Sequence, residues 1–439
     1  MGHLLMVESW VGAMSRLLPR AIAEAGHTFT FLTRDLHHYL RSAPEGVAHP
    51  LLGARNLVTA DTNDLSALLP QAERLHGALH FDGVLSSCDY YLPTVAAIAG
   101  HLGLPGPAPQ AVAAACRKDE TRRTLRAAGV PGPRFAVCDG FVAAAVAARE
   151  IGYPLVFKPV DLCAGMFVRR IDDERELAAA HRALDAFPVN ARGQQRSPAV
   201  LLEELLEGPE VSVETVSYGG RAHVIGVTDK SVGGAPGFIE TGHMFPAGLA
   251  ADETEAAART AVDALEALGL DQVVAHTEIK LTASGPRVVE VNPRPAGNRI
   301  TELVRHVTGI DLAAACVDLA LGREPELEPR ETGVPSAAIG FLLPAADGVL
   351  TGYDLAGDGS HPEGESEVPD VTAELEKAPG VLEVRLAEPG TRVRATVDNN
   401  GYLGHLMASG AAPGSGPGDA RTRVASLLAP VRPRVVAGR

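Results

Sequence analysis

The strongest chemical signal in this chain is a set of acidic and amide side chains on what reads as a β-hairpin. The segment 273–297, VVAHTEIKLTASGPRVVEVNPRPAG, alternates apolar and polar residues on both sides of a short turn. A three-residue loop over 283–285, ending in a glycine suited to positive φ, would join the two strands. Because side chains at intervals of two share a face, one face of the hairpin gathers four polar side chains: His276, Glu278, Glu290 and Asn292.

The register set by this loop places Glu278 opposite Glu290 and Lys280 opposite Val288. Two directly opposed carboxylates destabilise a hairpin unless a cation lies between them. Carboxylate and carboxamide oxygens are hard donors that Mg²⁺ accepts while it keeps water or phosphate oxygens. Arg294 would reach the same region and stabilise charge on a transferring phosphoryl group. The alternative is an exposed hairpin with ordinary surface acids, and a one-residue slip would undo the pairing.

Lysine is scarce in this chain, which makes each lysine informative. Most of its 39 basic residues are arginine, and a retained lysine suggests a need for a compact, rotatable ammonium. We take three as candidate contacts to phosphate or carboxylate, and assign Lys280 and Lys377 to chance. The three candidates are Lys118, Lys158 and Lys230.

The elements that must position these residues follow an α/β pattern at the start of the chain. Strand-like and helix-like segments alternate over the first hundred residues, which predicts a parallel sheet covered on both faces. Ser87, Cys88 and Asp89 follow one strand at its carboxyl edge, where open α/β sheets bind ligands. A helix cap before LPTVAAIAG explains these three residues equally well.

Further along, one helix is expected over 110–128 and another over 253–268, with Asp252 as the N-cap of the second. The polar segment 188–198 predicts an exposed turn, and the glycine-rich segment 233–238 predicts a mobile loop. Short strands and a helix near 419–429 follow in the last hundred residues.

Composition excludes several classes of protein. A net charge of −15 argues against a nucleic-acid surface, and no apolar run approaches the ~18 residues of a membrane span. Five scattered cysteines and the absence of a signal peptide predict reduced thiols and a cytoplasmic location. No Walker phosphate loop, GxGxxG, HExxH or GxSxG motif occurs.

The hairpin segment closely resembles the metal-binding segment of the ATP-grasp superfamily, especially its carboxylate–amine ligases, which include the L-amino acid ligases. KDETRRTLRAAGVPGPRF, PLVFKPV and LLEELLEGPEVSVE resemble further family segments in the expected order, so the likeness covers essentially the whole chain. One departure is VDLCAGMF at 160–167, which holds one glycine and no serine where many relatives have a glycine- and serine-rich phosphate loop.

The resemblance implies an ATP-grasp fold of mixed α/β and α+β content, divided into four parts. These are an N-terminal parallel α/β domain (1–108), a first ATP-binding lobe with a mobile lid (109–203), a second lobe with the hairpin (204–328) and a C-terminal α+β domain (329–439).

The resemblance also implies residue roles. The nucleotide site would consist of Lys118 and Lys158 on the phosphates, Glu203 and Leu206 presenting backbone groups to adenine, and Glu210 on the ribose. The Mg²⁺ ligands would be Glu278, Glu290 and Asn292, with Mn²⁺ as an accepted substitute, and the catalytic residues Arg294 and Lys158. SVGGAPGFIETGHMFPAG resembles the substrate-facing segment of the L-amino acid ligases, which implies substrate contacts from Lys230, Glu240, His243 and Asn298.

The implied activity is ATP- and Mg²⁺-dependent ligation of amino-acid-like substrates through an acyl phosphate, with ADP and phosphate released. The implied partners are small molecules, not nucleic acid or membrane, with a homodimer as the expected assembly. Two alternatives stay open: an ATP-grasp carboxylase or purine-pathway enzyme, and a non-catalytic nucleotide-binding regulator. The E-T-G-H segment favours the ligase, and the intact acidic hairpin speaks against the regulator.

Overall fold

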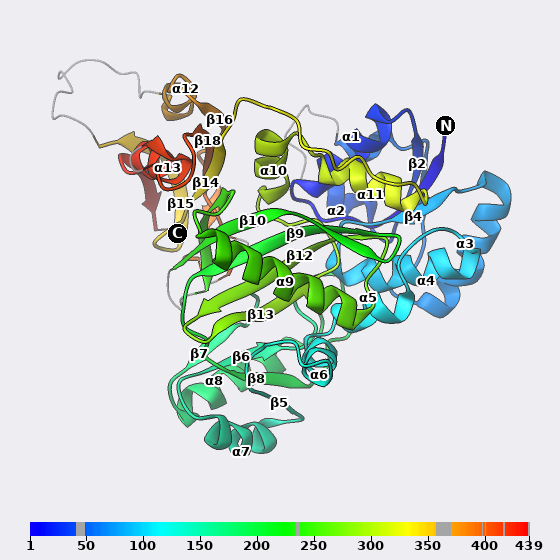
Figure 1. The fold of residues 1–439 in the computed structure, drawn as a ribbon, viewed down its shortest axis with the longest axis horizontal. Helices are drawn as coiled ribbons and strands as arrows, with labels where there is room; N and C mark the ends of the chain where they lie inside the picture. Colours follow the sequence, from blue (N-terminus) through cyan, green and yellow to red (C-terminus); the bar gives the residue numbers. More distant parts are fainter. Residues whose placement is uncertain are drawn as a thin grey trace.

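The structure is a computed structural model that describes residues 1–40, 49–233, 238–356, 370–396, 398–399, 401–415 and 418–437. The strands of these residues form four sheets (Figure 1). No helix among the described residues is long and apolar enough to cross a bilayer. All five cysteines are free thiols.

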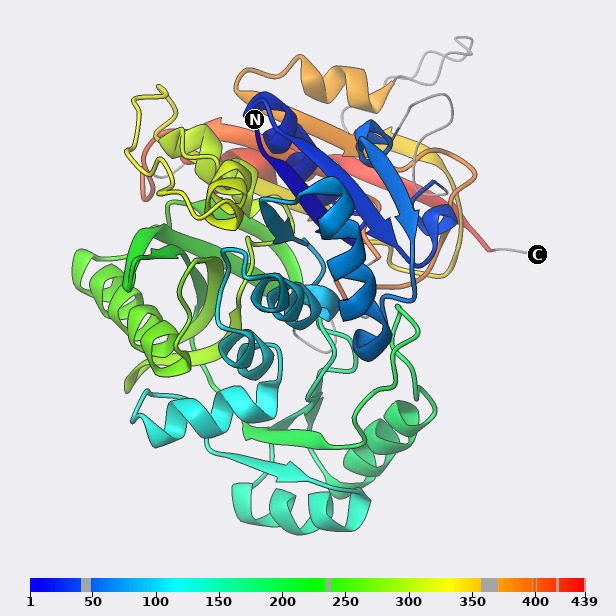
Figure 2. The same cartoon turned by 90° about the vertical axis from the view of Figure 1, so that its right-hand side faces the viewer.

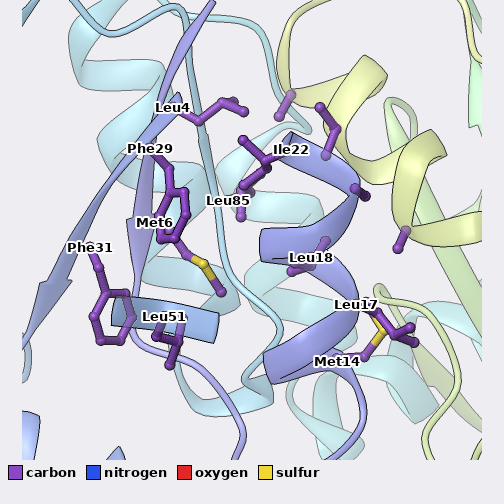
Figure 3. Packing of buried hydrophobic residues seen from close by; sticks show 14 of the residues in the cluster. Leu4, Met6, Met14, Leu17, Leu18, Ile22, Phe29, Phe31, Leu51 and Leu85 are labelled. Carbon is purple, nitrogen blue, oxygen red and sulfur yellow. The ribbon is translucent and has the colours of Figure 1, made fainter. Parts of the chain in front are cut away.

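The N-terminal part is the predicted parallel sheet, with strand order β3-β2-β1-β4. Helix α1 packs on this sheet through a stripe of apolar side chains that includes Leu18 and Ile22 (Figure 3). The elements are β1 (His3–Val7), α1 (Met14–Glu24), β2 (Thr28–Thr33), α2 (Leu36–Leu40), β3 (Asn56–Thr59), α3 (Leu65–Leu79), β4 (Gly83–Leu85) and α4 (Leu92–Leu102).

The single helix expected over 110–128 is two helices, α5 (Pro109–Ala115) and α6 (Lys118–Ala127). The break occurs because Arg117 is extended, at φ −116° and ψ 108°. Both helices pack against α9 (Ala251–Leu268). Helix α6 therefore begins at Lys118, which places this lysine on the first turn beside the hairpin.

A four-stranded antiparallel sheet, β5-β8-β6-β7, forms the first lobe at the bottom of Figures 1 and 2. Helices α7 and α8 cover it around a core that includes Phe157 and Leu202. The elements are β5 (Phe135–Cys138), α7 (Phe141–Ile151), β6 (Leu155–Pro159), β7 (Arg169–Ile171), α8 (Glu174–Asp185) and β8 (Val200–Glu204).

An eight-stranded sheet, β13-β12-β9-β10-β11-β14-β18-β16, forms the centre of the molecule. Helix α9 packs on its β9, β10, β12 and β13 strands (Figure 1). The N-cap of α9 is Ala250 and not Asp252, because Glu253 reaches back to accept a hydrogen bond from the Ala250 N–H. The strands are β9 (Glu210–Tyr218), β10 (Arg221–Gly233), β11 (Ile239–Phe245), β12 (Val273–Thr282), β13 (Gly285–Asn292), β14 (Ser336–Leu342), β16 (Val381–Leu386) and β18 (Gly404–Gly410).

The C-terminal strands β14, β18 and β16 thus continue the sheet that carries the hairpin. A small sheet, β17-β15-β19, lies beside them. The remaining elements are α10 (Ile300–Thr308), α11 (Leu312–Ala320), β15 (Gly348–Leu355), α12 (Val371–Glu376), β17 (Arg392–Val393), α13 (Ala420–Leu428) and β19 (Val431–Val436). Helix α11 packs on α1 of the N-terminal part. The four domain boundaries given above therefore stay predictions.

Two expected loops have different outcomes. The segment 188–198 contains a turn with several exposed residues, as predicted, but Arg192 within it is only 5 % exposed and packs against the N-terminal part. Most of the glycine-rich loop predicted at 233–238 lies outside the described residues.

Candidate active site

The antiparallel hairpin β12–β13 brings the two carboxylates together as predicted. Glu278 pairs directly with Glu290, and His276 pairs with Asn292. Glu278 and Glu290 both line one cavity, and the amide of Asn292 joins them there. The arrangement puts two carboxylates and a carboxamide on a common surface, which is a set of hard oxygen donors.

The predicted turn and the register beyond the acidic pair were wrong. The turn holds two residues, and Gly285 already belongs to β13. Lys280 consequently pairs with Arg287 and not with Val288. A β-bulge at Val289 adds one residue to β13, which offsets the shorter turn and restores the opposition of the two acids.

A cavity of about 530 Å³ lies between the N-terminal part, the first lobe and the large sheet. Of the residues to which the resemblance assigns roles, it contains all except Glu203, Leu206 and His243. The candidates that line it are Lys118, Lys158, Glu210, Lys230, Glu240, Glu278, Glu290, Asn292, Arg294 and Asn298. Leu206 is half-buried between β8 and β9, outside this lining.

Lys118 stands at the edge of the acidic pair. Its ammonium lies 2.8 Å from Glu290 Oε1 and donates to the carbonyl oxygen of Leu162 at 2.6 Å. Burial lowers the pKa of Lys118, but the Glu290 carboxylate together with neighbouring groups raises the net pKa above the usual value. Leu162 belongs to the segment 160–167, which differs from the glycine- and serine-rich phosphate loop of many relatives. Cys163, Ala164 and Gly165 of that segment line the cavity. The segment therefore approaches the site through its backbone.

Glu203 uses its side chain in a buried ion-pair group, a role the sequence did not suggest. Its carboxylate accepts a hydrogen bond from Arg122 Nε and lies 2.6 Å from Lys158 Nζ. Burial raises the pKa of Glu203, but Arg122 and Lys158 bring it down to about 2. Arg122 also donates to the carbonyl of Val289 at 2.6 Å, so the bulge is tied to the same group.

Lys230 is surrounded by carboxylates. Its ammonium lies 2.5 Å from Glu278 Oε1, 3.0 Å from Glu240 Oε1 and 3.4 Å from Glu210 Oε1. Burial lowers its pKa, but the three acids raise the net pKa well above the usual value. Lys280, which was assigned to chance, lies 3.2 Å from Glu210 Oε2 and so also pairs with an acid that lines the cavity.

Glu214, on the strand β9 that pairs with β12, is a buried acid that the sequence did not single out. Glu214 Oε2 lies 3.0 Å from Nδ1 of His276, whose other ring nitrogen lies 3.3 Å from Glu278 Oε1. Burial lowers the pKa of His276, but Glu214 raises it to about 9. An acidic residue inside the apolar alternation of β9 was the signal for this contact. The His276 ring therefore contacts both the Glu214 and the Glu278 carboxylates.

Arg294 is held by the N-terminal part. Its Nε donates to Asp89 Oδ1 at 2.7 Å, and Trp10 Nε1 donates to Asp89 Oδ2 at 2.6 Å. Burial lowers the pKa of Arg294, but Asp89 raises the net pKa above the usual value. The helix-cap alternative for Asp89 is wrong, because α4 begins at the N-cap Tyr91 without a side-chain cap.

The substrate candidates form a cluster around Glu240. Glu240 Oε2 accepts a hydrogen bond from Asn298 Nδ2 and lies 3.2 Å from His243 Nε2. Asn298 also lies 3.4 Å from the hydroxyl of Tyr402, whose ring stacks on Phe341 at 4.4 Å. His243 is buried behind Glu240 and does not reach the cavity surface itself.

The donor set suits a hard cation that keeps other ligands. No group of three or more His, Cys, Asp or Glu able to hold a metal occurs within the described ranges. Two carboxylates and an amide leave the remaining coordination positions to water and phosphate oxygens, as Mg²⁺ requires. The opposed acids, each paired with a lysine, are consistent with such an ion.

Three family models match the chain. The ATP-grasp N-terminal domain matches residues 20–106, the ATP-grasp domain matches residues 151–302, and the L-amino acid ligase C-terminal domain 2 matches residues 363–436. The three matches follow one another along the chain without overlap.

Known proteins are similar over large parts of the chain. The uncharacterized protein y4rH of Sinorhizobium fredii is 30 % identical over 387 residues, which are 87 % of this chain and 76 % of that protein. Human carnosine synthase 1 is 31 % identical over 60 % of this chain, which corresponds to 33 % of that longer protein. Alanine–anticapsin ligase of Bacillus subtilis is 27 % identical over 64 % of this chain and 67 % of that protein.

Solved structures share the fold at lower identity. An L-amino acid ligase from Bacillus licheniformis superposes with a TM-score of 0.78 at 22 % identity, over 99 % of both chains. A phosphoribosylglycinamide synthetase from Anaerococcus prevotii reaches a TM-score of 0.66 at 15 % identity, over 99 % of this chain and 100 % of that chain.

Proposed function

The chain belongs to the ATP-grasp superfamily and carries the C-terminal domain of the L-amino acid ligases, and we propose that it joins two amino-acid-like substrates through an amide bond. The observation that carries this proposal is the opposed pair Glu278 and Glu290, which faces a cavity lined also by three lysines and Arg294. Such a site suits phosphoryl transfer to a carboxylate.

The nucleotide roles rest on the cavity geometry. Lys118 and Lys158 line the cavity near the first lobe, where they would contact the phosphates of ATP. Glu210 lines it at the start of β9, where its carboxylate suits the ribose hydroxyls. Glu203 and Leu206 lie outside the lining, so only their backbone groups remain candidates for adenine.

Glu278, Glu290 and Asn292 would hold Mg²⁺, with Mn²⁺ as an accepted substitute. The ion would neutralise charge on the phosphates of ATP and on the transferring phosphoryl group. Lys118, which pairs with Glu290, would then exchange this carboxylate for a phosphate.

The substrate carboxylate attacks the γ-phosphate and forms an acyl phosphate with release of ADP. Arg294 would offset the negative charge, while Glu240, which contacts the buried His243, would hold the ammonium of the first amino acid. Lys230 holds Glu240 and Glu278 together, and Asn298 limits the room beside Glu240. The amine of the second substrate then displaces phosphate, which gives the amide.

Two other activities remain as alternatives. A carboxylase or purine-pathway enzyme shares the fold, but the match to an L-amino acid ligase C-terminal domain favours the ligase. A non-catalytic regulator would have no need for opposed carboxylates that destabilise a hairpin. We also propose a cytoplasmic location and a homodimer. Light scattering of the purified protein would test the homodimer.

The test of the proposed function is phosphate release from Mg·ATP across a matrix of paired amino acids. We expect release that needs one particular pair, a coupled product by mass spectrometry, and no product from Glu290→Ala. Glu207→Ala is the matched control, because Glu207 is exposed and lies outside the cavity lining. Nucleotide binding without turnover on any pair would favour the regulator, and bicarbonate-dependent release would favour the carboxylase.

A further inference from the structure

The segment 188–198 of the first lobe makes a buried contact with the N-terminal part. Arg192 is 5 % exposed and donates to the carbonyl oxygen of Ser9. Its guanidinium lies over the rings of Trp10 and Tyr39, at 5.5 Å from each centroid. A desolvated guanidinium that both stacks and donates is held in one geometry.

The backbone and side chains of the same segment add further contacts. The carbonyl oxygen of Arg192 accepts hydrogen bonds from Arg34 Nη2 at 2.7 Å and from Asn63 Nδ2 at 2.9 Å. Gln194 Nε2 donates to the carbonyl oxygen of Tyr90 at 3.1 Å. The first lobe and the N-terminal part are therefore joined by directional hydrogen bonds.

This contact continues to the catalytic arginine. Trp10, on which Arg192 lies, donates to Asp89 Oδ2, and Asp89 Oδ1 accepts from Arg294 Nε. Trp10, Asp89 and Arg294 all line the cavity. The side chains form an unbroken line from the first lobe to the residue that would stabilise the transferring phosphoryl group.

We propose that Arg192 is a latch that holds the first lobe closed, and that Asp89 is the positioning residue through which the closed state orients Arg294. The proposal rests on the proposed ligase function. Closure excludes water from a reactive acyl phosphate, and the same contact places the arginine. When the lobe opens, Arg192 leaves Trp10, and the support of Asp89 against Arg294 weakens. Phosphoryl transfer is thereby confined to the closed, water-excluding state.

Trp10 is the single tryptophan of the chain, so its fluorescence reports the latch directly. The experiment measures acrylamide quenching of Trp10 with and without Mg·AMP-PNP, and the ratio of phosphate released to amide formed. Arg192→Ala is compared with Arg175→Ala, since Arg175 lies on α8 of the same lobe with 87 % of its side chain exposed. Arg192→Lys serves as a second variant, because it keeps the charge but loses the planar fork.

We expect Mg·AMP-PNP to protect Trp10 from acrylamide in the wild type and in Arg175→Ala, but not in Arg192→Ala. Arg192→Ala should release more than one phosphate for each amide, because water reaches the acyl phosphate. Asp89→Asn should lower kcat by about 10²-fold while the KM for ATP changes little, because only the arginine is displaced. Arg192→Lys should fall between the wild type and the alanine variant in both measurements.

Equal quenching in Arg192→Ala and Arg175→Ala, with one phosphate released for each amide in both, would overturn the proposal that Arg192 holds the first lobe closed. An Asp89→Asn enzyme with normal kcat would overturn the positioning role. A wild type that protects Trp10 with Mg·AMP-PNP but forms no amide from any pair would refute the proposed function and leave the latch itself supported.

Discussion

At the scale of single residues, the side chain of Glu203 has a structural role, because its carboxylate pairs with the buried Arg122 and Lys158. Glu203→Gln should cost about 3–5 kcal/mol of unfolding free energy at pH 7, because Arg122 and Lys158 stay buried without their carboxylate. The folded pKa of about 2 lies below the ordinary 4.5. The stabilisation is therefore complete above pH 4.5 and is lost as the pH falls toward 2.

Urea unfolding of the two proteins at pH 7 and pH 3 checks this expectation. The difference in unfolding free energy between the wild type and Glu203→Gln should be smaller at pH 3 than at pH 7. The control is Glu204→Gln, since Glu204 pairs with an arginine that is 64 % exposed and should matter little. Equal stability loss in both variants would contradict the buried ion-pair account.

His243 gives a second prediction at this scale. His243→Ala removes the group that lies 3.2 Å from Glu240, so the KM for the carboxyl-donating amino acid should rise by about ten-fold. The KM for ATP should change much less, because no nucleotide candidate contacts this imidazole. Steady-state kinetics with each substrate varied in turn provide the measurement. His181→Ala, in the first lobe beside Asp185, is the control. An equal rise in both constants would place His243 outside substrate binding.

At the scale of elements, strand β11 depends on a close approach at Gly242. A Cβ at this position would lie 2.6 Å from the carbonyl oxygen of Ile339 on β14. Gly242→Ala should therefore push the strands apart, lower the melting temperature and raise the KM for the amino acid through Glu240 and His243. Thermal unfolding and kinetics test this, with Gly233→Ala as control because its Cβ would meet only a methyl group at 3.4 Å. Identical behaviour of the two variants would show that β11 tolerates the displacement.

Local patterns predicted the elements better than their junctions. The opposition of Glu278 and Glu290 follows from strand alternation and a short turn, so the sequence was sufficient. The same reasoning made the turn one residue too long and missed the bulge at Val289. These two errors cancel at the acidic pair, so the predicted opposition of Glu278 and Glu290 was still correct. Strand alternation could not show that Arg122 anchors the bulge, since Arg122 is remote in sequence.

At the scale of the whole molecule, binding of Mg·nucleotide should stabilise the fold through the hairpin. Mg²⁺ and AMP-PNP together should raise the unfolding free energy by about 2.7 kcal/mol when the complex is at 100 times its Kd. In Glu290→Ala the nucleotide should still stabilise, but the added effect of Mg²⁺ should disappear. Differential scanning calorimetry with EDTA as the metal-free reference measures both. A full Mg²⁺ effect in the variant would show that the ion binds elsewhere.

Contacts between distant segments account for most of what the sequence did not reveal. The C-terminal strands join the hairpin sheet through β11 and β14, a pairing that no local pattern encodes. The polar segment 188–198 looks exposed in sequence, yet Arg192 is buried because Trp10 and Tyr39 lie far away in the chain. Asp89 and Arg294 likewise meet only in the folded protein. The resemblance to the family predicted the order of the segments along the chain, but the contacts between them are seen only in the structure.

In the proposed reaction, the carboxylate of one substrate is phosphorylated before the amine attacks. The most direct measurement uses the carboxyl-donating amino acid labelled with ¹⁸O in its carboxylate, followed by mass spectrometry of the released phosphate. An acyl phosphate leaves one carboxylate oxygen with the phosphate, so the account predicts ¹⁸O-labelled phosphate in step with amide and ADP. Unlabelled phosphate, or AMP and pyrophosphate in place of ADP, would contradict it.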